Sequence, residues 1–272
     1  MIIMKRLVAI VAGFGLVASP AIAGLTQISG SGTGGNIATA TTASGSGGFS
    51  TTLTASVGVG NLIVISVTQR GSTGTAWSCT DDAGSPGTFP GSSANTYTAG
   101  NATPYNTSTV TTVQTFYSVL TTALTSTTNS IKCTTGAAVS TAFVATAWSG
   151  NAAAGSVYDA SAYAQSGAAS GITDLNVGPT GTLAQNCSNG ELLVITAASQ
   201  SAVTLTTVTP VTMTNATGNS FNRGWYLAGS NAAFTWTPTV TVTAGAKAEQ
   251  IEGFKAASCP SGKNLLTLGV GE

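Results

Sequence analysis

The chain has 272 residues, of which only 6% are charged, with eight Lys or Arg, eight Asp or Glu and no histidine. Soluble domains usually carry about 25% charged residues, so this surface must be hydrated mainly through hydroxyl groups and the backbone. The lack of Lys and Arg clusters argues against nucleic-acid binding. The lack of histidine excludes Ser-His-Asp and Cys-His catalysis and removes the commonest zinc ligand.

The first residues have the order of a secretory signal peptide. A short basic start, Met1–Arg6, precedes an apolar run at 7–20 and then Ala-Ile-Ala before Gly24. This is a charged region, an apolar region and a small-residue cleavage site. The apolar run is roughly 14 residues long, short of the ~20 that cross a bilayer. We therefore expect residues 1–23 to be removed and the mature chain to be secreted or surface-displayed, without a transmembrane segment.

Four cysteines in a chain with an export signal predict disulfides, because exported proteins fold in oxidising compartments. Three pairings are possible. We expect Cys79–Cys133 and Cys187–Cys259, since each pair joins predicted strands or strand ends within one half of the chain. Free thiols and a metal site are the weaker alternatives, because no C-x-x-C spacing and no histidine are present.

Short strand-like runs follow one another along the mature chain, separated by Gly, Ser, Asn and Pro. Several of them alternate apolar with hydroxyl residues, which is the period of a half-buried strand, and no window after the signal peptide keeps a helical period. The expected fold is an all-β antiparallel β-sandwich, of jelly-roll or Ig-like type. The predicted strands are 61–69, 75–81, 95–100, 113–120, 129–135, 141–149, 191–199, 203–214, 223–229, 239–245 and 248–256.

The predicted organisation is a signal peptide, a Gly/Ser/Thr-rich arm, one sandwich domain and a short tail. The arm is interpreted as flexible or as an edge strand, and either terminal segment could pair with a neighbouring subunit. Two half-modules in tandem are the alternative to one continuous sandwich. The boundaries are 1–23, 24–48, 49–258 (or 49–150 and 183–258 as half-modules) and 259–272.

A faint internal echo links the two halves. The sequence GNLIVIS at 60–66 resembles GELLVIT at 190–196, and FYSVL at 116–120 resembles WYLAG at 225–229. The offsets differ, so this is not a strict repeat. Convergent strand composition explains the echo about as well as duplication does.

The order GNLIVISV, WSCTDDAG, NTYT, VQTFYSVL, NSIKCT, FVATAWSG and GELLVI resembles a pattern of bacterial and phage-encoded secreted β-sandwich surface domains. The likeness covers about residues 50 to 256. It implies a sandwich fold and a non-enzymatic surface, adhesive or virion-associated role. This chain departs from the pattern by an insertion at 85–94, which should stand out as a loop at one end of the sandwich.

Candidate ligand-binding residues lie in or beside that insertion. Exposed loop aromatics stack on sugars or anchor protein partners, which makes Phe89, Tyr97 and Tyr105 candidates, although they could also fold back over the sandwich end. Asp81 and Asp82 could supply oxygen ligands to Ca²⁺. An Asx-type turn closing a hairpin is the more ordinary interpretation of the two aspartates, and no other cofactor is expected.

A catalytic site is not expected. A glycosidase that lacks histidine would need two facing carboxylates, and Asp81 with Glu252 or Glu249 is the pair considered. Three functional hypotheses follow. The first is a non-enzymatic exported or particle-surface sandwich for structure or attachment, with a surface glycan or a protein as partner. The second is a virion or appendage structural subunit, and the third is a glycan-active enzyme that uses carboxylates alone.

Overall fold

The computed structural model covers most of the chain between Gly24 and Cys259. The expected signal peptide, 1–23, and residues 260–272 of the expected tail lie outside the described part. The described residues are 24–42, 48–70, 76–101, 105–107, 111–136, 140–168, 174–214, 219–242 and 245–259.

The described chain is all β apart from one 3-10 turn, η1 (Thr33–Gly35), and its strands pair antiparallel. Sheet 1 has the order β1-β10-β4-β8-β6, with β2 also on β10 and β7 on β8. Its strands are β1 (Thr26–Ile28), β2 (Ala38–Thr42), β4 (Leu62–Arg70), β6 (Thr98–Ala99), β7 (Tyr105–Thr107), β8 (Thr111–Val119) and β10 (Ser140–Ser149).

Sheet 2 comes entirely from the second half of the chain and has the order β11-β16-β12-β14-β13, with β15 also on β12. Its strands are β11 (Tyr158–Ala168), β12 (Glu191–Thr207), β13 (Thr212–Met213), β14 (Asn219–Ala228), β15 (Thr239–Val242) and β16 (Lys247–Lys255). Sheet 3 is small and has the order β3-β9-β5. It contains β3 (Phe49–Thr52), β5 (Trp77–Asp81) and β9 (Ser130–Thr135).

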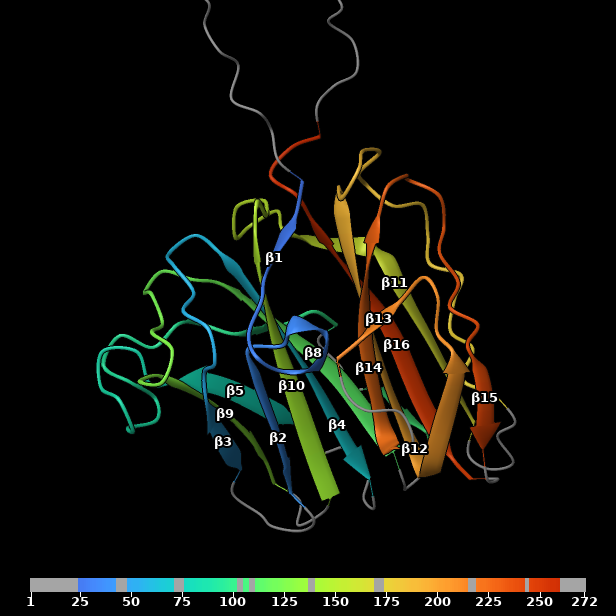
Figure 1. Cartoon of the computed structure of the whole chain (residues 1–272), viewed down its shortest axis with the longest axis horizontal. Coiled ribbons are helices and arrows are strands. Elements are labelled where there is room, and N and C mark those ends of the chain that lie inside the picture. Colours follow the sequence, from blue (N-terminus) through green and yellow to red (C-terminus); the bar gives the residue numbers. More distant parts are fainter. Residues whose placement is uncertain are drawn as a thin grey trace, which may run out of the picture.

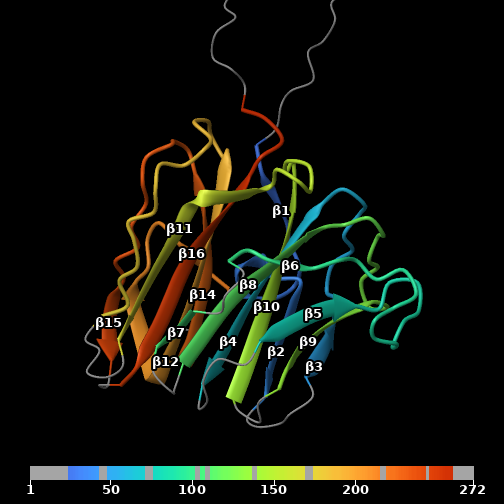
Figure 2. The ribbon, with the colours of Figure 1, turned by 180° about the vertical axis from the view of Figure 1, so that it is seen from behind.

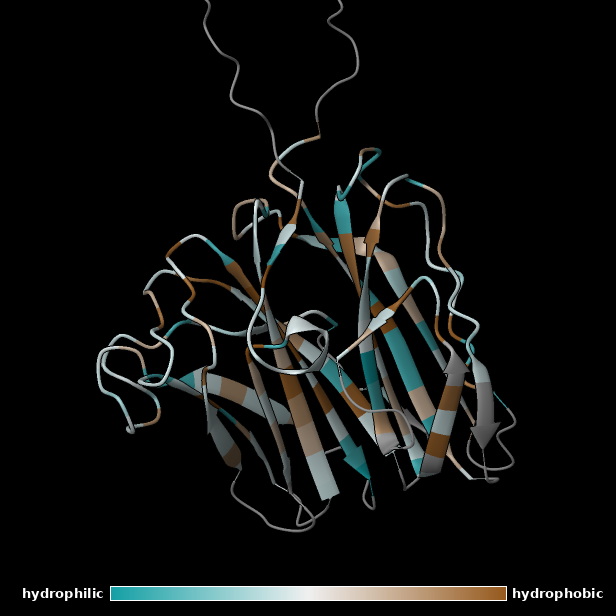
Figure 3. Ribbon diagram, viewed as in Figure 1, coloured by the Kyte–Doolittle hydropathy of each residue, from teal (hydrophilic) through white to brown (hydrophobic). Residues whose placement is uncertain are grey.

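The sheets are stacked with sheet 1 in the middle (Figures 1 and 2). Because side chains alternate between the two faces of a strand, β4 sends Ile63 and Ile65 toward sheet 3, and Leu62 and Val64 toward sheet 2. Apolar and polar bands accordingly alternate along the strands in Figure 3. The β-sandwich prediction is confirmed, with a third sheet added on its outer side.

The two halves of the chain have the same topology. We call residues 26–149 module 1 and 158–255 module 2. In module 1, β4 lies between β10 and β8, and β6 flanks β8; in module 2, β12 lies between β16 and β14, and β13 flanks β14. On the outer side of each module, β9 of module 1 corresponds to β15 of module 2. The isolated bridge Val57–Leu124 likewise corresponds to the bridge Val177–Trp236.

The strand registers of the two modules also agree, residue by residue. Leu62 pairs with Trp148 and Val119, and Leu192 pairs with Phe254 and Leu227. Likewise, Thr98 faces Tyr117 on β8, as Thr212 faces Trp225 on β14. Strand composition alone would not produce one shared topology and register, so the correspondence favours an internal duplication.

The modules pack face to face about a pseudo-twofold axis between β4 and β12. The hydroxyls of Ser66 and Thr196, which are equivalent positions in the sequence echo, hydrogen-bond to each other across the interface at 2.9 Å. At one end of the interface lies an apolar cluster that includes Leu62, Val64 and Leu192. Around Ser66 and Thr196 the interface is polar. Through the apolar and the polar contacts together, each module covers the inner face of the other.

Two segments outside the predicted strands contain ordered strands. Residues 24–42 of the expected arm form β1, η1 and β2 on the edge of β10, which matches the edge-strand alternative. Within 149–182, β11 pairs with β16, and Leu175 and Val177 are buried on the outer face of sheet 2. Neither segment is a structureless linker over its described residues.

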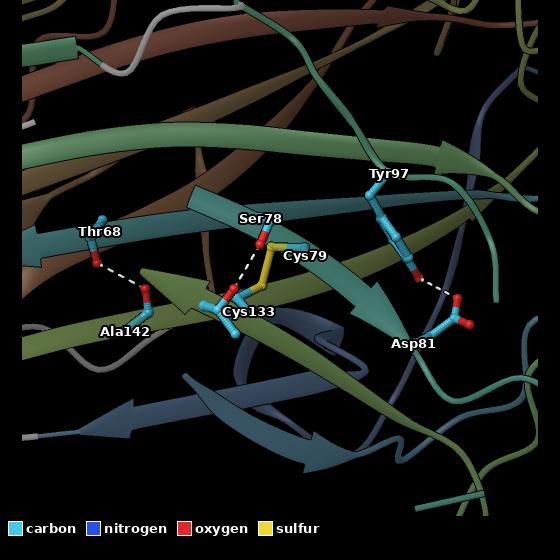
Figure 4. Close-up of a disulfide and its surroundings, with 8 residues drawn as sticks. Thr68, Ser78, Cys79, Asp81, Tyr97, Cys133 and Ala142 are labelled. Carbon is cyan, nitrogen blue, oxygen red and sulfur yellow. Dashed lines mark hydrogen bonds between the residues drawn. A yellow bond between two sulfur atoms is a disulfide. The ribbon is translucent and has the colours of Figure 1, made fainter. Parts of the chain in front are cut away.

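Both predicted disulfides are formed. Cys79 and Cys133 are directly opposed on β5 and β9, with Cα atoms 4.1 Å apart (Figure 4). Cys187 and Cys259, with Cα atoms 5.5 Å apart, join the residues before β12 to those after β16. Two disulfides are typical of proteins that fold in an oxidising compartment. The described residues contain no helix long and apolar enough to cross a membrane.

The interface between modules gives a matched stability test. Leu62 and Leu192 are both fully buried at equivalent positions, so Leu62→Ala and Leu192→Ala should each lower the free energy of unfolding by about 2–5 kcal/mol. Urea denaturation measures this, with the exposed Thr204→Val as a control expected within about 0.5 kcal/mol of the parent. A loss below about 1 kcal/mol at either leucine would contradict the shared interface.

Candidate functional site

The two aspartates considered for calcium are fully buried and hold the inserted loop. The carboxylate of Asp81 accepts hydrogen bonds from the backbone N–H of Ala83 (3.1 Å), from the side chain of Asn95 (2.9 Å) and from the Tyr97 hydroxyl (3.1 Å; Figure 4). These bonds fix the chain on both sides of the loop.

Asp82 has the same role one residue later. Its carboxylate accepts the backbone N–H of Gly87 at 2.7 Å and of Ser130 at 2.8 Å, so it ties the loop to β9. Among the residues that the structure describes, no group of three or more Asp, Glu, Cys or His side chains could hold a metal ion.

The three candidate aromatics lie in different surroundings. Tyr97 packs against the core between sheets 1 and 3 and donates to Asp81. Phe89 is half-buried in the loop, with the Lys132 ammonium 5.6 Å from its ring centroid. Tyr105, on β7, packs against the small cluster of Val113, Ala198 and Ala248. The structure therefore does not gather these aromatics into one site.

The acid pair considered for glycosidase chemistry is not formed. Asp81 ends β5 in sheet 3, whereas Glu249 and Glu252 lie on β16 in sheet 2, and sheet 1 separates the two layers (Figure 2). The sequence places these acids on strands and at strand ends, but it does not reveal that the strands belong to opposite sides of a stack.

A different feature stands out, a groove of about 210 Å³ at the β6–β8 edge of module 1, here called the Tyr117 groove. Most of its lining side chains are exposed or half-buried, so it opens to solvent. Hydroxyl and aliphatic side chains surround one tyrosine. The lining residues are Thr96, Thr98, Tyr117, Ser118, Val119, Thr121 and Ala154.

Aromatic packing holds Tyr117 in place. Its ring stacks on Tyr158 at 5.6 Å between centroids with an interplanar angle of 9°, and it meets Phe254 edge-on at 5.4 Å. Both partners belong to module 2, so the interface between modules orients the tyrosine. Burial, and then the nearby Glu252, raises the pKa of the Tyr117 hydroxyl, which therefore stays neutral and able to donate a hydrogen bond.

The pseudo-twofold axis shows why a groove exists here. Trp225 is the module 2 counterpart of Tyr117, and its indole N–H donates to the Gly34 carbonyl at 3.1 Å. Gly34 belongs to residues 29–37, which leave the sheet between β1 and β2 and are called here an excursion of the chain. A side chain at Gly34, where φ is +64°, would collide with the Met213 carbonyl. The turn at Gly34 therefore packs closely on module 2 and covers Trp225.

On the Tyr117 side the corresponding excursion is shorter. The bulge at 160–163 interrupts the pairing of β11 with β16 at the equivalent register. It places Tyr163 in a hydrogen bond with Asn101, and none of its residues lines the groove. The equivalent surface is closed by the chain in module 2 and left open in module 1.

Behind the groove lies a buried carboxyl group. Glu252 is fully buried, and one of its oxygens accepts the Asn101 backbone N–H at 3.1 Å. A Cβ at Gly100 would collide with the other oxygen, so the carboxyl group lies directly against this glycine. Burial raises the pKa of Glu252 to about 8. The group is therefore largely protonated at neutral pH, and it is too deep to touch a ligand in the groove.

A pair of carboxyl groups, Glu191 and Asp159, holds the bulge at 160–163. Glu191, with no exposed surface, hydrogen-bonds to Asp159, and burial together with this partner raises the pKa of Glu191 to about 8. Burial opposes ionisation of Asp159 too, but hydrogen bonds from Glu191 and Ser161 outweigh it and keep the Asp159 pKa below its usual value. Asp159 also accepts from Ala184, so the pair joins the bulge to the chain before β12.

The third buried glutamate on sheet 2, Glu249, is part of an ion-pair cluster. The Lys247 ammonium lies 3.0 Å from Glu249 and 2.6 Å from Asp174. Burial raises the pKa of Glu249 to about 8, more than the lysine lowers it. The cluster includes none of the groove-lining residues, and it ties Asp174 to β16.

No protein-family model, curated protein or solved structure matches this chain. The groove and the buried acids are therefore interpreted from their own geometry.

The Tyr117 groove does not follow from the sequence patterns. Its threonines look like the ordinary hydroxyl positions of half-buried strands. The echo between FYSVL and WYLAG is the one signal that points to this position, and it aligns Tyr117 with Tyr226. Strand register moves the correspondence by one residue, so the structural counterpart of Tyr117 is Trp225.

Burial of Glu252 implies a dependence of stability on pH. Its pKa is about 8 in the folded chain and near 4.5 when exposed, so between these values the folded state keeps a proton that the unfolded state has lost. Stability therefore falls as pH rises through this window, by up to about 1.4 kcal/mol per pH unit for each such group. Glu191 and Glu249 should act in the same direction.

Glu252→Gln removes one of these groups while keeping its shape. We expect a shallower loss of unfolding free energy between about pH 5 and pH 7.5, measured by urea denaturation at each pH. Asp174→Asn is the control, because Lys247 lowers the pKa of Asp174 and this carboxyl titrates below the window. An unchanged slope in Glu252→Gln would show that Glu252 is not buried in its protonated form.

Proposed function

We propose that the protein is a non-enzymatic attachment module, exported or displayed on a particle surface, which binds an uncharged glycan in the Tyr117 groove. One observation carries the proposal. The chain covers Trp225 in module 2 but leaves its counterpart, Tyr117, beside an open groove. Residues 29–37 of module 1 cover Trp225, and residues 160–163 are their shorter counterpart in module 2. A longer excursion at 160–163 would be needed to cover Tyr117 in the same way.

The lining of the groove suits a sugar. The hydroxyls of Thr96, Thr98 and Thr121 can each donate and accept, as sugar hydroxyls do. Tyr117 and Val119 supply apolar surface against which the C–H face of a sugar ring can pack. The described lining includes no Asp, Glu, Lys or Arg, so an anionic sugar would gain no ion pair there.

The same geometry supports binding without catalysis. Glycoside hydrolysis needs two carboxyl groups that reach the substrate. Glu252, the carboxyl that raises the pKa of Tyr117, is fully buried and is held by Asn101 behind the groove. A ligand in the groove would therefore meet hydroxyl, aliphatic and aromatic groups only.

Filling the groove tests the proposal. Ala154 lines the groove, whereas its exposed neighbour Ala153 does not. On an array of neutral and acidic glycans, we expect the parent protein to bind neutral glycans and Ala154→Trp to lose at least about tenfold in affinity, equivalent to about 1.4 kcal/mol. Ala153→Trp is the matched control and should bind like the parent.

A second pair of variants tests the hydroxyls. Thr98→Val should weaken binding, while Thr204→Val, on an exposed strand position of module 2, should not. Equal binding by Ala154→Trp and the parent would contradict the groove assignment. Absence of any glycan signal, together with assembly seen by light scattering, would favour a structural subunit instead.

A further inference from the structure

A buried lysine lies between two carboxyl groups on the outer face of sheet 2. Lys247 and Glu249 are two residues apart on β16, so their side chains leave the same face of the strand. Ile251 continues this face and packs in one core cluster with Leu175. Asp174 directly precedes Leu175, which has no exposed surface. The buried leucine therefore holds the aspartate over β16.

Both carboxyl groups contact the same nitrogen atom. The Nζ atom of Lys247 lies 2.6 Å from an oxygen of Asp174 and 3.0 Å from an oxygen of Glu249. The side chains of Lys247 and Glu249 are 6% and 0% exposed, whereas that of Asp174 is 47% exposed. The amine is therefore enclosed by protein, and the cluster opens to solvent only at Asp174.

The protons of the cluster are unevenly shared. Burial raises the pKa of Glu249 to about 8, so this group holds a proton at neutral pH. Burial opposes the charge of Lys247, but Glu249 and Asp174 outweigh it and raise the Lys247 pKa. The hydrogen bond from Lys247 lowers the pKa of Asp174. The resting state is thus an ammonium and a carboxylate in contact, with a protonated carboxyl group beside them.

An amine and a carboxyl group held in this way can condense to an amide. Fixing two reactants in contact raises their effective concentration to about 10⁵–10⁸ M, which favours a condensation that free molecules in water do not make. The product is uncharged, so the reaction also removes a charge from a lysine that is almost fully buried.

We infer that Lys247 and Asp174 form an intramolecular isopeptide bond between Nζ and Cγ, with Glu249 as the general acid and base. Glu249 suits this role because it contacts the attacking nitrogen and is shielded from water. The bond would form whether or not the Tyr117 groove binds a glycan.

The reaction needs no further reactant. Lys247 passes a proton to Asp174, which gives a neutral amine and a neutral acid. The Nζ lone pair attacks Cγ of Asp174, while Glu249 gives its proton to the carbonyl oxygen and takes one from Nζ. Glu249 then protonates one hydroxyl group on Cγ, which leaves as water, and recovers a proton from the other. The ammonium and the carboxylate become one amide and one water, and Glu249 ends as it began.

Peptide mapping of the purified, reduced and alkylated protein tests the bond directly. Trypsin cuts after lysine and arginine, so without the bond it releases residues 133–223, 224–247 and 248–255 as separate peptides. With the bond, we expect no cut after Lys247. Residues 224–255 should be joined to 133–223, and the mass of the pair should be lower by one water. Complete cleavage after Lys247 would overturn the proposal.

Two variants of equal shape test the role of Glu249. Glu249→Gln removes the acid and base, and we expect the linked fraction to fall at least about tenfold, since such catalysis contributes about 10²–10⁴-fold. Glu252→Gln is the matched control, because it changes another buried glutamate of the same strand and should keep the bond. Circular dichroism checks that both variants are folded. Equal linked fractions in the two variants would overturn the assignment of Glu249.

Asp174→Ala removes the other partner at a half-exposed position. We expect this variant to lose the joined peptide and to be cut after Lys247. A joined peptide that persists in Asp174→Ala would show that Lys247 is linked to a different residue, which would overturn the proposal.

Discussion

The packing of β4 against β12 is the contact on which the rest of the structure depends. Each of these strands is the centre of its sheet, and the inner face of each packs against the other module. Leu62, Val64 and Leu192 provide the apolar part of the contact, where removing surface from water is stabilising. Ser66 and Thr196 hydrogen-bond where the contact becomes polar, which satisfies two groups that would be costly to bury alone.

The proposed binding site lies where the two modules stop being equivalent. Their shared topology places Tyr117 and Trp225 at matching positions, but the excursions beside them differ in length. The longer one covers Trp225 with Gly34, and the shorter one leaves the Tyr117 groove. The inserted loop at 85–94 is a further difference, and buried Asp81 and Asp82 hold it in place.

The all-β class and the main strands could be predicted because alternation of apolar and hydroxyl residues is local information. The two disulfides could be predicted because each pair joins predicted strands or strand ends within one half of the chain. Strand β11 was not among the predicted strands, since YDASAYAQSGA shows little contrast between its two faces. The groove and the buried acids could not be predicted, because they depend on which layers meet. Glu252 looks like a surface acid of a strand until module 1 covers it.

If the shared interface holds the fold together, the two modules must unfold as one cooperative unit. Differential scanning calorimetry of the purified protein, with both disulfides intact, measures this most directly. We expect a single transition whose calorimetric enthalpy equals its van't Hoff enthalpy. Two separate transitions, or a calorimetric enthalpy about twice the van't Hoff value, would show that the modules unfold independently and would contradict the central role of the interface.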